Sequence, residues 1–453
     1  MPNPRNTEEL ILTGSPDAVQ RLLGRAASEI SGLGEVRSLV VNHGSRTMKL
    51  GLVRMGQGPL EIMHRLAGWA RAERAAVRAE LNCATGRPFR VERGARGWNL
   101  DPWNWGDNPW TWGDNPWNWG DNPWGWGDNP VLPMVVAAGA TPAEGEVLFW
   151  RQGAFRHIGL TDEAGLRIPA LADHMGEGVL AGVFDALPSK PVSYPWLALH
   201  PGRTPQEQPW DDRDLSDHGL VCASLIHAVA PRARIHLYEV CGKAGHGRLF
   251  PLLEALAEFI DLAAGKPAVI SLSLGSLEFD GSAALRVLLQ KATDMGMVVC
   301  ASAGNAAHGT PKVSALLPAQ VPAAFPNVLA VSSSNLSGER ATYSQRGDIA
   351  APGGEDLGHH GPDDPEDIIG CGVSVGTSGY VRMDAGTSFA TPLVAGAAAL
   401  LLEGMAVRDA GTYARVLEAL KAAARQGAPT AGETLAGAGL GAGILYLPTL
   451  FHA

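Results

Sequence analysis

Four polar residues with side chains suited to catalysis lie at the ends of predicted strands or the starts of predicted helices. Asp185 lies near the end of the apolar stretch GVLAGVFDAL, and His218 opens the helical pattern HGLVCASLIHAVA. Asn305 closes the strand MVVCASAGN. Ser388 lies where the glycine-flanked turn DAGTSFATP enters a helix, with Pro392 expected in the first helical turn. Ligands gather at the carboxyl ends of parallel strands, so these side chains are predicted to meet.

Acyl transfer needs such a set of side chains. A serine hydroxyl needs a base to take its proton, a histidine serves near neutral pH, and a buried carboxylate fixes the histidine tautomer. We therefore expect Ser388 as nucleophile, His218 as base and Asp185 as the orienting carboxylate. The side-chain amide of Asn305 and the backbone N–H of Ser388 are expected to bind the developing oxyanion. The order Asp, His, Ser is a known convergent arrangement.

The elements that must position these residues begin at about residue 147, where the chain becomes richer in Ala, Gly and Val. Apolar strands alternate there with helical patterns, which is typical of a parallel α/β sheet. The other predicted strands are RIHLYEV, AVISLSLG and VLAVSSSN. The other predicted helices are GRLFPLLEALAEFIDLAA and GSAALRVLLQKATDM.

From about Phe149 onward these stretches resemble the subtilisin-like serine proteases, or subtilases. GTSFATPLVAG is similar to the family's serine motif G-T-S-x-A-x-P-x-V-A-G, ASAGN to its oxyanion segment, and VISLSLG to its substrate-binding strand. The resemblance implies a peptide-bond hydrolase with a three-layer subtilisin-like domain, a mainly parallel α/β sheet, over residues 147–453. It also implies that substrate is bound by these residues: Ser273, Leu274, Gly275, Ala303 and Gly304.

Two motifs depart from the family pattern. The family's Asp motif usually continues Asp-Ser/Thr-Gly, whereas this chain has Asp185-Ala186-Leu187, and the His motif His-Gly-Thr-His-Val-Ala-Gly is here HGLVCAS. A peptide-binding pseudoprotease therefore stays open as an alternative to an active enzyme. Cys222 stands where proteinase K and its relatives carry a cysteine beneath the catalytic histidine, which implies inactivation by mercurials.

Residues 1–96 are predicted to form a small ferredoxin-like α+β domain. The strand ELILTG is followed by a helix capped by Ser15, by a hairpin around NHGS, by the helix GPLEIMHRLAGWARAE and by the strand VRAELNC. This is a β-α-β-β-α-β order. Its place before a subtilase-like domain resembles that of a propeptide, which assists folding and inhibits until cleaved. An adaptor that stays attached, so that a partner activates a signalling protease, is the alternative.

A tryptophan-rich repeat linker joins the two parts over residues 97–130. A unit of roughly D-N-P-W-x-W-G comes round about four times, and its prolines exclude helix and central strand. Three interpretations stay open. The repeat is a tether whose tryptophans cover apolar surface, a recognition ribbon for a partner, or an expanded linker.

Composition narrows the class of protein. The chain has 453 residues, of which 45% are hydrophobic and 18% charged, enough for a large core. The net charge of −10 argues against nucleic-acid binding. No apolar run reaches the length of a membrane span, and the start lacks the features of a secretory signal. We expect a cytoplasmic protein, with non-standard export left open. The five cysteines form no evident disulfide framework, and four are expected as buried small residues: Cys83, Cys241, Cys300 and Cys371.

The chemistry is expected to need no cofactor. The loop GGEDLGHHGPDDPEDIIG combines His359, His360 and several carboxylates that could hold a metal, but a solvated loop is favoured. Structural calcium is common in subtilases, yet no ligand set here is clear enough to assign. His227 and His236 are expected to be partly buried packing residues rather than ligands.

The segment after Asn305 bears on specificity. In the family this neighbourhood lines the pocket for the residue before the scissile bond. The chain has Ala306 and Ala307 there and no acidic side chain. A neutral or apolar preference is therefore predicted over a basic one.

Overall fold

The structure is a computed structural model, and it describes most of the chain outside residues 87–146. The repeat linker, Ala306 and Ala307, and the loop with His359 and His360 lie outside the described residues, as does Cys83. The described residues are 9–30, 33–43, 46–54, 59–72, 77–81, 84–86, 147–149, 153–162, 166–188, 192–202, 218–242, 246–275, 282–305, 319–354, 369–375, 378–405, 408–425 and 439–451.

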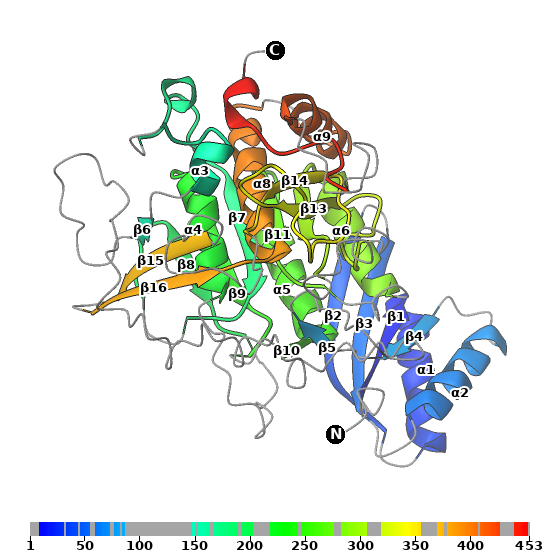
Figure 1. Cartoon of the computed structure of the whole chain (residues 1–453). Coiled ribbons are helices and arrows are strands. Elements are labelled where there is room, and N and C mark those ends of the chain that lie inside the picture. The colour runs from blue at the N-terminus through cyan, green and yellow to red at the C-terminus, as the bar shows by residue number, and fades with distance from the viewer. Residues whose placement is uncertain are drawn as a thin grey trace.

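Seven strands form the main sheet, and every neighbouring pair in it is parallel (Figure 1). This confirms the expected parallel α/β sheet. The edge strands β8 and β14, of four residues each, were not predicted. In order across the sheet the strands are β14 (Ile349–Pro352), β13 (Leu329–Ser334), β12 (Val298–Ser302), β11 (Ala268–Leu272), β7 (Leu180–Asp185), β9 (Arg234–Glu239) and β8 (Leu197–His200).

Helices cover both faces of this sheet and give the domain three layers. Alternate strand residues enter two separate buried clusters: Val183 and Val269 belong to one, Phe184 and Ile270 to the other. Strands buried on both faces appear as continuous apolar runs in a sequence, which is why they could be predicted. The first cluster packs against α4 (His218–Val229), α8 (Thr387–Leu402) and α9 (Thr412–Ala423), and the second against α5 (Leu249–Leu262) and α6 (Ala283–Asp294).

Helices α4 and α8 lie close together because their contact is built from small residues. A Cβ atom on Gly396 would lie 2.6 Å from Cβ of Val229, a distance that real Cβ atoms do not adopt. The rest of α8 is rich in alanine and is buried along almost its whole length. The N-termini of these two helices carry His218 and Ser388, so the close packing fixes the spacing of the two side chains.

The N-terminal segment forms an antiparallel sheet of its own, in the order β2-β3-β1-β4. Helix α1 begins as expected, with the Ser15 hydroxyl accepting a hydrogen bond from the N–H of Ala18. Leu10 and Leu12 pack against the two helices of this segment. Its elements are β1 (Glu9–Gly14), α1 (Pro16–Glu29), β2 (Gly34–His43), β3 (Arg46–Arg54), α2 (Pro59–Ala72) and β4 (Val77–Leu81).

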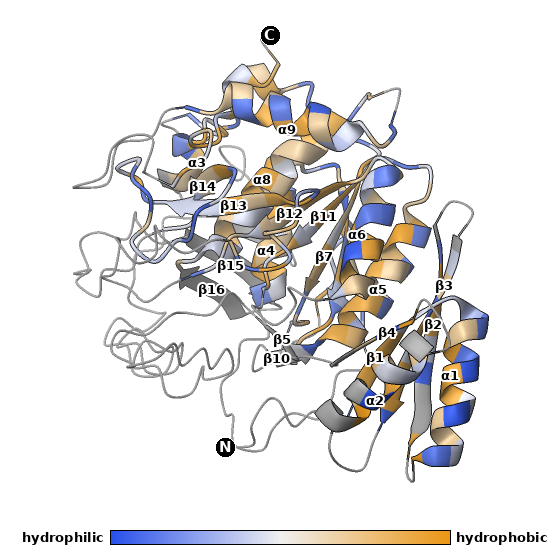
Figure 2. Ribbon diagram, turned by 90° about the vertical axis from the view of Figure 1, so that its right-hand side faces the viewer, coloured by the Kyte–Doolittle hydropathy of each residue, from blue (hydrophilic) through white to orange (hydrophobic). Residues whose placement is uncertain are grey.

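The other face of this small sheet is buried against the main domain. Figures 1 and 2 show β1 to β3 beside α5, and the side chains of Ile11, Val41 and Leu52 share one buried cluster with those of α5. Arg37 Nη1 lies 2.5 Å from a carboxylate oxygen of Glu254 on α5. Residues 9–54 therefore contact the main domain through apolar packing and an ion pair.

Shorter strands complete the description. Strand β5 (Ala84–Gly86) pairs antiparallel with β10 (His246–Arg248), and β6 (Val147–Phe149), β15 (Ile369–Val375) and β16 (Ser378–Asp384) form a small sheet. No helix in the described part of the chain is both long enough and apolar enough to cross a membrane.

Candidate active site

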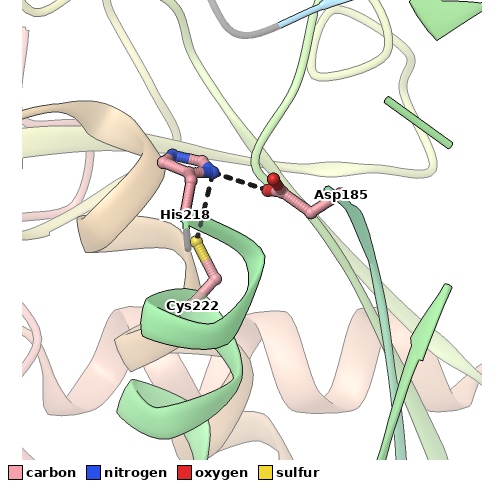
Figure 3. A group of neighbouring side chains, drawn as sticks. All are labelled: Asp185, His218 and Cys222. Carbon is pink, nitrogen blue, oxygen red and sulfur yellow. Dashed lines mark hydrogen bonds and ion pairs between the residues drawn. The ribbon is translucent and has the colours of Figure 1, made fainter. Parts of the chain in front are cut away.

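Asp185 and His218 form a hydrogen-bonded pair at the carboxyl edge of the main sheet. Asp185 ends β7, His218 begins α4, and His218 Nδ1 lies 2.7 Å from Asp185 Oδ2 (Figure 3). The second carboxylate oxygen accepts the N–H of Ala186 at 2.8 Å. Both side chains are buried. Because an ionised carboxylate only accepts hydrogen bonds, the proton is on Nδ1 and leaves Nε2 as the basic nitrogen.

Gly219 permits this close approach. A Cβ atom at Gly219 would lie 2.3 Å from the carbonyl oxygen of Ala186 and 2.8 Å from Cβ of Asp185. The glycine after His218 therefore lets the start of α4 lie directly against the end of β7. The altered neighbours Ala186 and Leu187 leave the Asp–His pair intact.

Ser388 is the second residue of α8, at the same edge of the sheet. Its hydroxyl donates to the carbonyl oxygen of Ser273 at 3.4 Å. The thiol of Cys222 lies 3.5 Å from the Ser388 carbonyl oxygen and 3.9 Å from His218 Nδ1, so it touches both residues. The phenyl ring of the adjacent Phe389 meets the His218 imidazole edge-on, with centroids 5.2 Å apart. Cys222 and Phe389 thus hold the histidine and the serine turn together.

Pro392 is the sixth residue of α8, which corrects its expected place in the first turn. A proline at this position cannot donate a hydrogen bond to the carbonyl four residues earlier, which belongs to Ser388. That carbonyl accepts instead from the hydroxyl of Ser273 at 2.7 Å and from the thiol of Cys222. The missing helical hydrogen bond is replaced by two side chains of the site.

Asn305 directs its amide toward the start of α8. Its Oδ1 accepts from the N–H and the hydroxyl of Thr387, at 3.1 and 2.8 Å. The position of an added Cβ on Gly386 lies 3.6 Å from Asn305 Nδ2 and 3.7 Å from the backbone nitrogen of Ser388. Two donors therefore border one space next to the serine, the arrangement that a developing oxyanion needs.

The residues expected to bind substrate lie at neighbouring strand ends. Ser273, Leu274 and Gly275 follow β11, and Ala303 and Gly304 follow β12, which is paired with β11 in parallel. All of them are buried. Gly304 has a φ of +117°, a conformation that favours glycine.

One group of metal-ligating side chains occurs among the described residues, and it consists of Asp185, His218 and Cys222. The hydrogen bond between Asp185 and His218 and the thiol contact already account for these three groups. A soft metal ion that prefers thiolate and imidazole ligands would fit the same atoms.

Two histidines and two cysteines expected to be packing residues are buried or partly buried: His227, His236, Cys241 and Cys300. The side chain of Cys371 lies outside the described residues. The imidazole of His227 stacks on Trp196 at 4.2 Å, and burial lowers its pKa to about 4. Burial, with the charge of His200 as a smaller cause, lowers the pKa of His236 to about 4. Cys241 and Cys300 are buried, and burial raises the pKa of the Cys300 thiol to about 12.

Two features near the site were not predicted from the sequence. The hydroxyl of Ser273 was assigned to substrate binding by resemblance, and its bond to the Ser388 carbonyl requires knowledge of the fold. Strand β10 was absorbed into a predicted helix, because GRLFPLL continues without a break into the apolar pattern of α5. The glycine in HGR, a poor helix former, was the available signal that the helix begins only after it.

An α/β domain with a buried Asp–His pair and a serine at a helix N-terminus defines the architecture of a serine hydrolase. A comparison with known families matches residues 196–439, more than half of the chain, to the subtilase family. The chain therefore belongs to the subtilase family. The matched region contains His218, Asn305 and Ser388 and begins after Asp185, whose place rests on its bond to His218.

Individual relatives agree with this assignment. The chain is 32% identical to subtilisin E of Bacillus subtilis (strain 168) over 256 residues, which covers 52% of this chain and 59% of that protein. It is 30% identical to subtilisin Savinase of Lederbergia lenta over 252 residues, covering 52% of this chain and 81% of that protein. The chain thus spans about 59% of the length of relatives such as subtilisin E. The crystal structure of a lanthipeptide protease superposes with a TM-score of 0.49 at 21% identity, covering 66% of this chain and 94% of that one.

Proposed function

We propose that the chain is a serine endopeptidase that hydrolyses peptide bonds through an acyl-enzyme. The observation that carries the proposal is the buried hydrogen bond of 2.7 Å between Asp185 and His218, at the same sheet edge as Ser388. The pair holds the imidazole in the tautomer that a base needs. Protein or peptide is the substrate, and the chemistry takes no cofactor. Nucleic acid and membranes are not among the proposed partners.

In the proposed reaction the Ser388 hydroxyl, which donates to the Ser273 carbonyl oxygen at 3.4 Å in the structure, turns toward His218. His218 Nε2 takes the proton of Ser388 Oγ as this oxygen attacks the peptide carbonyl carbon. The oxyanion is bound by Asn305 Nδ2 and by the backbone N–H of Ser388. The imidazolium then protonates the leaving amine, and the C–N bond breaks. A water molecule, deprotonated by His218, hydrolyses the ester and restores the Ser388 hydroxyl.

The proposal includes a proenzyme organised as residues 1–96, 97–130 and 147–453. The first part is a ferredoxin-like inhibitory domain, the second the repeat linker and the third the catalytic domain. The apolar contact between the small sheet and α5 supports this role, as does the pairing of β5 with β10. Along the chain, β10 follows β9 and precedes α5. Strand β9 pairs with β7, which ends in Asp185. A bound N-terminal domain would thus add a strand close to the catalytic edge, as an extended peptide does when it extends a sheet.

The test is the intact mass of the wild-type chain and of the Ser388→Ala chain, expressed side by side. If the proposal holds, only the wild type loses its first part, by a cut on the carboxyl side of β5. A serine-directed fluorophosphonate should label the wild type and leave Ser388→Ala unlabelled.

Other outcomes separate the alternatives. If both chains stay intact and only the wild type is labelled, the protein is an active protease whose N-terminal domain stays attached as an adaptor. An unlabelled wild type would support the pseudoprotease. Cleavage that begins only after a partner is added would support a regulated signalling protease.

A further inference from the structure

Gln320 occupies the space between the two segments expected to bind substrate. It is completely buried, although it lies in the connection between β12 and β13 and carries a polar amide. Its backbone N–H donates to the carbonyl oxygen of Ala303 at 2.8 Å, and its own carbonyl accepts from the N–H of Ala324 at 2.9 Å. These bonds fix the point from which the side chain extends.

The side chain reaches both glycines of the two strand ends. A Cβ atom on Gly275 would lie 3.0 Å from Gln320 Oε1, and a Cβ atom on Gly304 would lie 2.8 Å from Gln320 Nε2. The Gln320 amide therefore occupies the space that a side chain at either glycine would take. Gln345 closes the far side of Gly304: its backbone N–H donates to the Gly304 carbonyl at 3.0 Å, and its Oε1 lies 2.6 Å from the added Cβ.

We propose that Gln320 restricts the residue before the scissile bond to a small side chain, such as that of Gly, Ala or Ser. The inference rests on the proposed protease function, since it concerns the substrate of that same site. A substrate held between the ends of β11 and β12 directs this side chain at the Gln320 amide. A large apolar group would have to displace this completely buried side chain and the atoms packed around it. A small group leaves it in position.

The first experiment compares two peptide p-nitroanilides that differ only in the residue before the scissile bond, Ala or Phe. Wild type should hydrolyse the Ala substrate with a kcat/KM at least about tenfold higher than the Phe substrate. Gln320→Gly should shift the ratio at least about tenfold toward Phe, and Gln320→Ala should shift it in the same direction. Gln290→Ala is the matched control. Gln290 is an exposed glutamine on α6 whose amide donates to Asp294 at 2.7 Å, so its ratio should stay near that of wild type.

A second measurement decides the question if Gln320 variants fail to fold or if the chain does not cleave. Binding of two acetylated tetrapeptide acids, ending in Ala or Phe, is measured calorimetrically on the wild-type chain, which the proposed self-cleavage frees of its N-terminal domain. The Ala peptide should bind at least about tenfold more tightly. Equal affinities, binding of neither peptide, or a wild-type preference for Phe would overturn the inference.

The two proposals fail in different ways. A wild type that is labelled by the fluorophosphonate but cleaves both substrates equally refutes the role of Gln320 and leaves the protease. An unlabelled wild type that still binds the Ala peptide more tightly refutes the protease and supports the small-residue site.

Discussion

The hydroxyl of Ser273 donates a hydrogen bond of 2.7 Å to the backbone carbonyl of Ser388, the proposed nucleophile. This carbonyl lacks its helical partner because Pro392 has no N–H. Both serines are buried, so an unbonded carbonyl there would be costly. A residue that resemblance assigns to substrate binding thus also fixes the turn that presents the nucleophile.

Ser273→Ala should therefore destabilise the protein. We expect the free energy of unfolding to fall by about 1–3 kcal/mol, because the Ser388 carbonyl keeps only the weak thiol donor of Cys222. Urea denaturation is measured in the Ser388→Ala background, which prevents self-digestion. Ser302→Ala is the control: its hydroxyl lies 3.5 Å from two carbonyls, and the loss should be smaller.

A second change tests the cause of this loss. Pro392→Ala supplies the missing N–H, so in the Ser273→Ala background it should recover part of the lost stability. Strictly additive effects of the two substitutions would contradict the explanation.

Asn305→Ala should lower kcat by about 10²–10³ with little change in KM, because the amide is proposed to bind the oxyanion only as it develops. Thr387→Val removes one of the two donors that orient the Asn305 amide, at 2.8 Å, and should cost less. Steady-state kinetics with one peptide p-nitroanilide measure both variants. An Asn305→Ala chain that keeps more than about a tenth of the wild-type kcat would exclude this role.

Mercurials should inactivate the wild type through Cys222. Its thiol touches His218 and the Ser388 carbonyl, and a mercury atom bound there would displace the imidazole. Cys222→Ala should resist inactivation, whereas Cys300→Ala should stay as sensitive as wild type, since the buried Cys300 thiol has its pKa raised to about 12. Residual activity is followed in excess p-chloromercuribenzoate. Full activity of the wild type under these conditions would contradict the prediction.

Arg37→Ala should loosen the N-terminal domain from the main domain. The Arg37–Glu254 ion pair is partly buried, with 24% and 33% of the side chains exposed, and its loss should cost about 1 kcal/mol, or roughly fivefold in affinity. The activity of the full chain should then rise earlier after purification. Arg25→Ala breaks an exposed pair within α1 and serves as control. The charge-reversed pair Arg37→Glu with Glu254→Arg should restore slow activation, and a failure to do so would assign the effect to packing.

Much of the fold could be predicted because its strands are continuous apolar runs. β7, β11, β12 and β13 were each found within such runs, and α1 was found from its capping serine and helical apolar period. The short edge strand β8 was missed, since its four residues are only half-buried and carry no continuous pattern. Contacts between distant segments could not be predicted in this way. The hydrogen bond from Ser273 to the Ser388 carbonyl depends on how β11 meets α8. The position of the Gln320 side chain depends on how the ends of two strands enclose it.

Acid should destabilise the protein between pH 6.5 and about 4. Burial lowers the pKa of His227 from 6.5 to about 4. In this window the unfolded chain binds a proton that the folded chain excludes, so the folded state loses stability as the pH falls. The stability contribution of neutral His227 is complete above pH 6.5 and lost toward pH 4. At His227 this shift accounts for up to about 3 kcal/mol, and the shift at His236, which is less deeply buried, adds a smaller amount.

His227→Phe should remove roughly half of this loss, because it keeps the stacking on Trp196 and cannot be protonated. The Nδ1 atom of His227 is buried without a hydrogen-bond partner among the described residues, so replacing the ring with an apolar one breaks no hydrogen bond of that atom. Unfolding by urea is measured at pH 7 and at pH 4.5, in the Ser388→Ala background. His157→Phe is the comparison, since its pKa is lowered less. If His227→Phe loses as much free energy of unfolding between pH 7 and pH 4.5 as the chain with His227 does, other groups cause the acid sensitivity.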